Sequence, residues 1–190
     1  MRILSNLKQR VKYLKFKALL LGKRSKIIKP LIVSNPEHIF LENNVRIKEG
    51  ARIECYKEFF NQKLSPKLVI GKKVIIGYNF SCLVTDEITI GENTIIASNV
   101  LITSENHGIN PESEIPYYEQ ELINGKVSIG SGCWVGERVI ILPDVSIGKK
   151  CIIAAGSIVT KSVPDYSMVA GVPARVIKQY NFEEHKWIKV

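Results

Sequence analysis

The chain has 190 residues, 45% hydrophobic and 24% charged, so it suits a single domain and is neither a disordered chain nor a membrane-embedded bundle. It contains 27 Ile and 17 Val against only 14 Leu. Because β-branched side chains favour strands, this ratio argues strongly against a helical bundle. The formal net charge is +9, and it is distributed unevenly.

The N-terminal stretch 1–30 carries the excess positive charge. It contains ten Lys and Arg and no acidic residue, which leaves 17 basic against 18 acidic residues in the rest of the chain. A DNA-binding protein normally has basic residues across its body or on a recognisable reading element. We therefore expect no nucleic-acid partner.

Residues 1–32 form a separate N-terminal segment whose apolar residues recur at steps of three and four, as on one face of a helix. These residues are Ile3, Leu7, Val11, Leu14, Ala18 and Leu21. The longest purely apolar run, 18–21, is far shorter than the roughly 20 residues of a membrane-spanning helix, and no signal-peptide cleavage site follows it. Two alternatives remain: the basic helix lies on an anionic membrane surface, or it packs on its own domain with a solvated basic face.

A period of six residues organises the chain from about residue 41, most clearly over 129–164. Every sixth position is Ile or Val, and four residues after each stands Cys, Val or Ser. The aliphatic positions are Ile129, Val135, Ile141, Ile147, Ile153 and Val159. An ordinary sandwich would not keep this phase over six consecutive repeats, and hexapeptide periodicity is the signature of a parallel β-helix.

Each turn of this coil should use three of these repeats, in three short strands and three corners. Ile129 should then stack on Ile147, Val135 on Ile153, and Ile141 on Val159, with neighbouring strands parallel and about 4.8 Å apart. Cys133 and Cys151 are separated by the same interval. They should stack as core residues rather than react.

The expected β-helix covers residues 33–178, followed by a C-terminal tail at 179–190. The repeat is less regular in the earlier turns, and two extra residues before Ile90 shift the phase of the six-residue period. Two stretches interrupt the repeat: residues 55–67, and a longer loop at 108–126 that contains Pro111, Pro116 and two tyrosines. Loops that leave a regular scaffold are where function usually resides.

The cysteine and histidine positions do not suggest a metal site. Cys55, Cys82, Cys133 and Cys151 form no C-x-x-C pair. The three histidines, His38, His107 and His185, are widely separated. Without an export signal, we expect reduced thiols in a cytoplasmic protein.

Residues 127–178 resemble the left-handed β-helix hexapeptide acyltransferases, in the branch of maltose, galactoside, polysaccharide and xenobiotic O-acetyltransferases. The motifs that carry the resemblance are Cys133-Trp134-Val135-Gly136, Ile141-Leu142-Pro143, the run from Ala154 to Lys161 (AAGSIVTK) and the run from Val169 to Lys178 (VAGVPARVIK). The resemblance extends more weakly to about residue 68. It implies an all-β, left-handed coil, acetyl-CoA as the acyl donor, and a homotrimer with each active site in a groove between neighbouring subunits.

The resemblance also implies that His107 is the general base, because the family places a histidine at the end of a strand just before a long loop. Acetyl transfer from a thioester to a sugar hydroxyl requires a group that takes the hydroxyl proton, and imidazole has a suitable pKa. The alternative is a histidine at the base of the loop that only satisfies hydrogen bonds. Glu105, two residues earlier on the same side of an extended strand, could orient the ring.

For coenzyme A, the resemblance indicates a row of residues in the last turns of the coil. Trp134 would lie beside the pantetheine channel, or alternatively be a buried corner aromatic. The other expected contacts are Gly136, Glu137, Ala155, Thr160, Lys161, Arg175 and Lys178. The last two are basic positions suited to the nucleotide phosphates, whereas Glu137 replaces a small polar residue that is common in the family.

The acceptor site matches the family least. An asparagine of the sugar acetyltransferases is missing, and Asp86 either replaces their aspartate or is a turn residue. Tyr117 and Tyr118 could stack on a sugar or pin the loop.

The favoured function is acetyl-CoA-dependent O-acetylation of a carbohydrate in surface polysaccharide biosynthesis. The alternatives are N-acetylation of a nucleotide-linked amino sugar, O-acetylation of an antibiotic, and a non-catalytic interaction module. The enzyme would be cytoplasmic, and peripheral on the inner face of the membrane if the N-terminal helix binds lipid.

Overall fold

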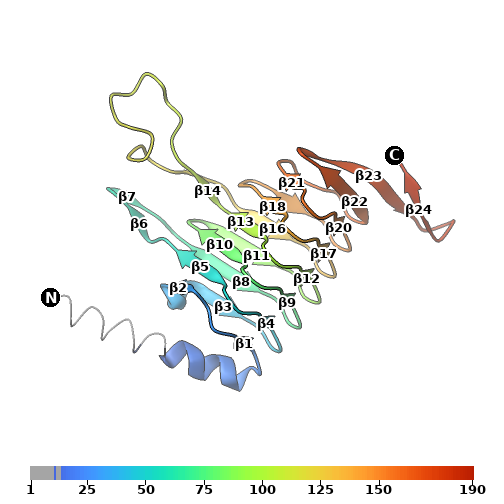
Figure 1. Cartoon of the computed structure of the whole chain (residues 1–190), viewed down its shortest axis with the longest axis horizontal. Coiled ribbons are helices and arrows are strands. Elements are labelled where there is room, and N and C mark those ends of the chain that lie inside the picture. Colours follow the sequence, from blue (N-terminus) through green and yellow to red (C-terminus); the bar gives the residue numbers. More distant parts are fainter. Residues whose placement is uncertain (1–10, 12–13) are drawn as a thin grey trace.

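The computed structural model describes residue 11 and residues 14–190, and its main body is a coil of three parallel sheets (Figure 1). The first sheet contains β1 (Lys26–Ile27), β4 (Arg46–Ile47), β9 (Ile75–Ile76), β12 (Ile95–Ile96), β17 (Trp134–Val135), β20 (Ile152–Ile153), β22 (Ser167–Gly171), β23 (Ala174–Asn181) and β24 (Lys186–Lys189). The second contains β2 (Ile32–Ser34), β5 (Arg52–Cys55), β10 (Ser81–Val84), β13 (Leu101–Thr103), β18 (Ile140–Ile141) and β21 (Ile158–Val159). The third contains β3 (Ile39–Leu41), β8 (Lys67–Ile70), β11 (Glu87–Ile90), β16 (Val127–Ile129) and β19 (Ser146–Ile147).

The predicted register is confirmed in the last turns. Ile129 pairs with Ile147, Val135 with Ile153, and Ile141 with Val159. All six side chains point inward and are buried. Complete burial of such a side chain contributes about 1.5–3 kcal/mol, so the stacked aliphatic columns stabilise the coil substantially.

Earlier turns are longer. Ile27 pairs with Ile47, and Ile76 with Ile96, so each of these turns holds two residues more than a turn at the C-terminal end. The extra length lies partly in the strands: β10 and β11, in the second of these turns, have four residues each, whereas β18 and β19 have two. This explains the shift of the sequence frame before Ile90.

The cysteines of the last turns stack inside a corner, as predicted. Cys133 and Cys151 are both buried, and their thiols lie 3.1 Å from the carbonyl oxygens of Gly148 and Pro164 respectively. Burial also raises the pKa of the Cys55 thiol to about 12. At neutral pH this thiol is therefore protonated and unreactive.

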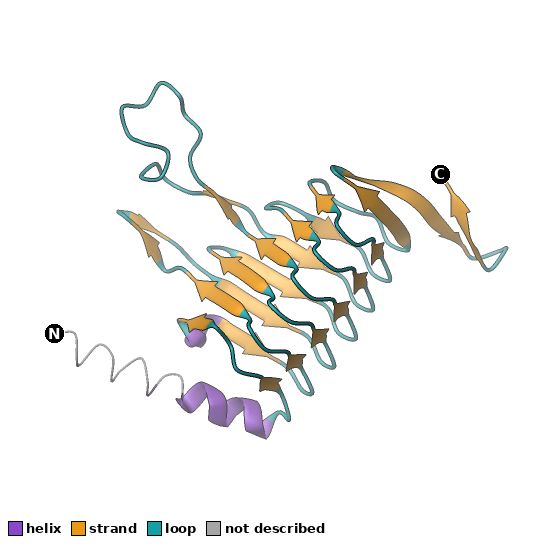
Figure 2. Ribbon diagram, viewed as in Figure 1, coloured by secondary structure: helices purple, strands orange, loops and turns teal. Residues whose placement is uncertain are grey.

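The corner that follows the second sheet carries both interruptions of the repeat, and we call it the loop corner (residues 35–38, 56–66, 85–86, 104–126, 142–145 and 160–162). It includes the 3-10 helix η1 (Pro36–His38), the hairpin of β6 (Glu58–Phe59) and β7 (Gln62–Lys63), and the two-stranded base of the long loop, β14 (Glu105–Asn106) and β15 (Ile123–Asn124). Figure 2 shows both excursions leaving the same edge of the coil. Both interruptions of the repeat are therefore excursions from one corner, and the longer one is the long loop expected from the sequence.

The N-terminal helix (residues 14–22) lies against the first turn of the coil. Its buried side chains are Phe16 and Leu20, which join the core. The apolar stripe from the sequence faces the other way: Leu14 is 64% exposed and Leu21 74%. Because a helix rotates by about 100° per residue, these two sets lie on roughly opposite faces. Ile3 and Leu7 lie outside the described residues.

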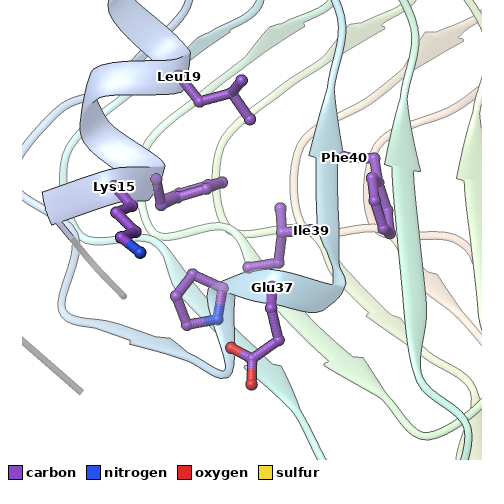
Figure 3. A pocket seen from close by; sticks show the side chains of 7 residues that line it. Lys15, Leu19, Glu37, Ile39 and Phe40 are labelled. Carbon is purple, nitrogen blue, oxygen red and sulfur yellow. The ribbon is translucent and has the colours of Figure 1, made fainter. Parts of the chain in front are cut away.

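An open apolar pocket of about 370 Å³ lies between the helix and the first turn (Figure 3). Its lining consists of Lys15, Phe16, Leu19, Pro36, Glu37, Ile39 and Phe40. Among the described residues, no helix is long and apolar enough to cross a bilayer.

Both expected domain boundaries fall inside regular structure. β1 begins at Lys26, within the segment expected to precede the coil, and pairs with β4. β23 runs through residue 178 and pairs with β24, so residues 179–190 continue an antiparallel hairpin rather than forming a tail. Contacts of Tyr180 with Phe182 and Trp187 hold this hairpin.

Candidate functional site

His107 directly follows β14 at the base of the long loop, in the loop corner. β14 pairs with β15 in antiparallel register, Glu105 with Asn124 and Asn106 with Ile123. The two ends of the loop are therefore fixed to each other, and His107 stands at a defined point on the scaffold.

A buried polar pair anchors this point to the coil. Ser104 and Thr85 are both buried. The Thr85 amide donates to Ser104 Oγ at 2.8 Å, and Thr85 Oγ1 donates to the Ser104 carbonyl at 3.1 Å. Buried polar groups without partners are costly, so this closed pair holds the chain three residues before His107 in one conformation.

The His107 side chain is exposed, and its ring makes an edge contact with Phe59, with centroids 5.5 Å apart. In the described part of the chain, no hydrogen bond or ion pair joins it to Glu105. Asn124 lies opposite Glu105, and its Oδ1 atom is buried without a hydrogen-bond partner among the described residues. Since directly paired residues share a face of an antiparallel ladder, this oxygen lies on the face that carries Glu105.

The hairpin of β6 and β7 is tied to the loop that follows His107. Gln62 Nε2 donates to the Leu122 carbonyl at 3.0 Å, and the Leu122 amide donates to Gln62 Oε1 at 2.8 Å. No periodic signal in the sequence marks Phe59, Gln62 or Asn124, because their contacts join segments that are far apart in the sequence.

The expected acceptor residues lie in the same corner. Asp86 is half-buried, and its Oδ1 accepts a hydrogen bond from the Glu87 amide at 2.7 Å, which is a contact typical of turns. Tyr117 and Tyr118 are exposed on the long loop. Gln120 holds that loop together with two hydrogen bonds to Asn110.

The expected pantetheine contact Trp134 lies on the outer face of the first sheet and is 57% exposed, so it is not a buried corner aromatic. It pairs with Ile95 on one side and Ile152 on the other. With Ile75, these residues form an outward row of apolar side chains on successive turns.

Gly136 and Glu137 lie in the corner that follows the first sheet. A Cβ atom on Gly136 would approach the Ala155 amide nitrogen to 2.6 Å, so close stacking of the turns requires a glycine here. Glu137 accepts a hydrogen bond from Asn99, which in turn accepts one from Asn79, and the three form a ladder over successive turns. Ala155 is exposed in the same corner.

The remaining expected donor contacts are divided between two places. Thr160 and Lys161 are exposed in the loop corner, after β21. Arg175 is exposed at the start of β23, and Lys178 is half-buried on the same strand. Within the part of the chain that the structure describes, no three His, Cys, Asp or Glu side chains gather in a metal-ligand group.

The structure therefore does not bring the candidate residues together in one chain. His107, Thr160 and Lys161 belong to the loop corner, whereas Trp134 lies on the first sheet. A site that uses both His107 and Trp134 requires the loop corner together with the outer face of the first sheet.

Comparisons with known proteins agree with this architecture. Residues 126–161 match the family described as bacterial transferase hexapeptide (six repeats), and residues 67–104 match the hexapeptide repeat of succinyl-transferase. The chain is 41% identical over 110 residues to the putative lipopolysaccharide biosynthesis O-acetyl transferase WbbJ of Escherichia coli, an alignment that covers 55% of this chain and 56% of that protein. It is 31% identical over 170 residues to the galactoside O-acetyltransferase of Escherichia coli, covering 88% of this chain and 74% of the relative.

A similar solved structure is that of a mutant form of AntD, an N-acyltransferase from Bacillus cereus, in complex with dTDP and coenzyme A. The TM-score is 0.65 at 25% identity, covering 84% of this chain and 81% of that one. Coil and repeats together define a left-handed parallel β-helix of the hexapeptide transferase class. The chain belongs to the hexapeptide-repeat acyltransferase family, in the branch of the sugar O-acetyltransferases.

Proposed function

We propose that this protein transfers an acetyl group from acetyl-CoA to a hydroxyl group of a carbohydrate, in the biosynthesis of a surface polysaccharide. The observation that carries the proposal is the fixed position of an exposed His107 beside the long loop, in a chain related to sugar O-acetyltransferases. The chain spans only 56% of the WbbJ relative, so the polysaccharide context rests on the shared coil.

Acetyl-CoA supplies an acyl group that is already activated as a thioester, so no nucleophilic Ser or Cys is needed. His107 takes the proton of the acceptor hydroxyl as that oxygen attacks the thioester carbonyl. The C–O bond forms, the C–S bond breaks, and His107 returns the proton to the departing sulfur. The products are the sugar acetate ester and CoA.

The basic residues at the C-terminal end suit coenzyme A. Arg175 and Lys178 lie on one strand and provide the cationic donors that phosphates require. Lys161 lies in the loop corner of the last turn. The exposed indole of Trp134 offers an apolar surface to the pantetheine arm.

A homotrimer would complete the site. His107 and Trp134 lie in different places on one coil, and a neighbouring copy in a closed ring would bring the first sheet of one subunit to the loop corner of the next. The outward apolar row Ile75, Ile95 and Trp134 gives such an interface an apolar surface to bury.

The enzyme would work at the inner face of the membrane, held by its N-terminal helix. Ten cations precede the first acidic residue, Glu37, and the exposed leucine stripe lies on the helix face away from the coil. Anionic lipids attract such a surface by about 1 kcal/mol per Lys or Arg.

N-acylation of a nucleotide-linked amino sugar is the second candidate, because the AntD structure is an N-acyltransferase with a bound nucleotide. An amine acceptor needs less help from a base than a hydroxyl does, so the presence of His107 favours the hydroxyl.

Mass spectrometry separates the two candidates. The protein is incubated with acetyl-CoA and candidate lipid-linked and nucleotide-linked glycans, and each product is then treated with mild alkali. We expect a mass increase of one acetyl group that alkali removes, since an ester is cleaved and an amide is not. An alkali-stable acetyl group on an amino sugar would contradict O-acetylation and support the second candidate.

A further inference from the structure

The hairpin of β6 and β7 interrupts the repeat without adding to the coil. Residues 58–63 leave the loop corner between β5 and β8, and β6 pairs with β7 in antiparallel register. Figure 1 shows this hairpin at the same edge as the long loop that begins with β14. Its side chains therefore serve something other than the stacking of turns.

Two contacts connect the hairpin to the proposed site. Gln62 makes two hydrogen bonds to the backbone of Leu122, on the returning end of the long loop. Phe59, on the facing strand, packs its ring against His107 at 5.5 Å and 61°. The hairpin thus contacts His107 through Phe59 and the returning end of the long loop through Gln62.

The tip of the hairpin exposes a further aromatic ring. Phe60 is 61% exposed and contacts Phe59 edge-on, with centroids 4.9 Å apart. Its φ is 47°, in the left-handed region where turns of this kind usually place Gly or Asn. A bulky residue there costs about 1–2 kcal/mol, and its exposure recovers little apolar burial. An exposed ring in a strained conformation, one ring away from His107, points to a role in binding.

We propose that this hairpin is a wall of the acceptor-sugar site: Phe60 is the platform on which a pyranose ring stacks, and Phe59 and Gln62 are positioning residues for His107. The C–H groups on one face of a pyranose carry partial positive charge, and the face of an aromatic ring is negative. Stacking also removes apolar surface from water. This inference rests on the proposed function.

The test uses the full-length protein saturated with CoA, and methyl galactoside, glucoside and mannoside as probes. Saturation-transfer NMR measures binding of each glycoside, and acetyl-CoA turnover gives the kinetic constants. We expect Phe60→Ala to raise the Kd and the acceptor KM about three- to ten-fold, with the KM for acetyl-CoA unchanged. Phe60→Trp should retain binding. Phe40→Ala, which removes another half-exposed ring on the outer face of β3, is the matched control.

A second variant tests the positioning role. Phe59→Leu keeps an apolar side chain but removes the ring contact with His107. We expect kcat to fall and the pH dependence of kcat to shift, whereas the acceptor KM should change little. Phe59→Tyr should restore both.

Any of three outcomes overturns the inference. If the wild-type protein acetylates a glycoside and Phe60→Ala leaves binding and KM unchanged, the hairpin is not part of the acceptor site although the proposed function stands. If Phe60→Ala changes the sedimentation coefficient, the ring belongs to a subunit contact instead. If the wild-type protein neither binds nor acetylates any probe, the proposed function fails together with the inference.

Discussion

Gly136 illustrates how a single residue can fit two explanations. The family resemblance assigns it to the pantetheine channel, whereas the structure shows the next turn occupying the place of its missing side chain, with the Ala155 nitrogen 2.6 Å and the Ile153 carbonyl oxygen 2.8 Å from an added Cβ. Both neighbours are backbone atoms, which move less readily than side chains. The glycine is therefore a requirement of the coil itself.

We expect Gly136→Ala to lower the free energy of unfolding by about 1–3 kcal/mol, the usual cost of overpacking. Chemical denaturation measures the change. Gly22→Ala is the matched control, because nothing lies within 4 Å of its added Cβ, and it should be neutral or slightly stabilising. An unaltered stability of Gly136→Ala, combined with a higher KM for acetyl-CoA, would contradict the packing explanation.

At the scale of elements, the sequence predicted the coil well because its signal is local and repeated. Inward positions such as Ile129 and Ile147 recur at a fixed spacing, and each repeat reinforces the others. The role of the hairpin of β6 and β7 could not be predicted from the repeat. Its contacts with Leu122 and His107 join two insertions that are far apart in the sequence and adjacent only in the folded chain.

The N-terminal helix shows a different limit of sequence analysis. Both the stripe through Leu14 and Leu21 and the pair Phe16 and Leu20 have helical spacing, and periodicity alone does not say which face packs. The structure buries the pair and leaves the stripe exposed, so the helix both packs on the coil and presents an apolar basic surface.

That surface leads to a prediction about lipid binding. The full-length protein should sediment with anionic liposomes at low salt and be released as salt rises, because electrostatic attraction to the surface is screened within a Debye length. Leu14→Ser combined with Leu21→Ser should weaken sedimentation. Ile109→Ser, which removes a residue 73% exposed on the long loop, is the control. Equal sedimentation of the double variant and the wild type would contradict the membrane role of the stripe.

The strand β23 contains the two basic residues that we expect to bind the phosphates of acetyl-CoA. Replacing Arg175 and Lys178 with Gln should raise the KM for acetyl-CoA more than that for the acceptor, because hydrogen bonds to phosphate from charged groups contribute about 1.5–3 kcal/mol each. Lys186→Gln combined with Lys189→Gln removes the same charge from the adjacent strand and should leave both constants unchanged. An unaltered KM for acetyl-CoA in the first variant would place the phosphates elsewhere, for example at Lys149 and Lys150.

In the whole molecule, His107 and Trp134 are separated on one coil, so the proposed site is complete only when subunits assemble. If each site joins the loop corner of one subunit to the first sheet of the next, His107→Ala and Trp134→Ala damage different halves of a site. Trimers reassembled from an equal mixture of the two variants should regain up to about a quarter of the wild-type rate.

Reassembly of each variant alone is the control and should give no recovery. Steady-state turnover after denaturation and refolding measures the effect, with sedimentation to verify the oligomer. A mixture no more active than the two variants separately would contradict a site shared between subunits.

The turnover of His107→Ala tests whether His107 acts as the general base in acetyl transfer to a carbohydrate hydroxyl. We predict that kcat falls by about 10² to 10⁴, while calorimetric binding of CoA and the sedimentation coefficient stay as in the wild type. His185→Ala, in the C-terminal hairpin, should turn over normally. Near-normal turnover of His107→Ala on the same acceptor would contradict the claim.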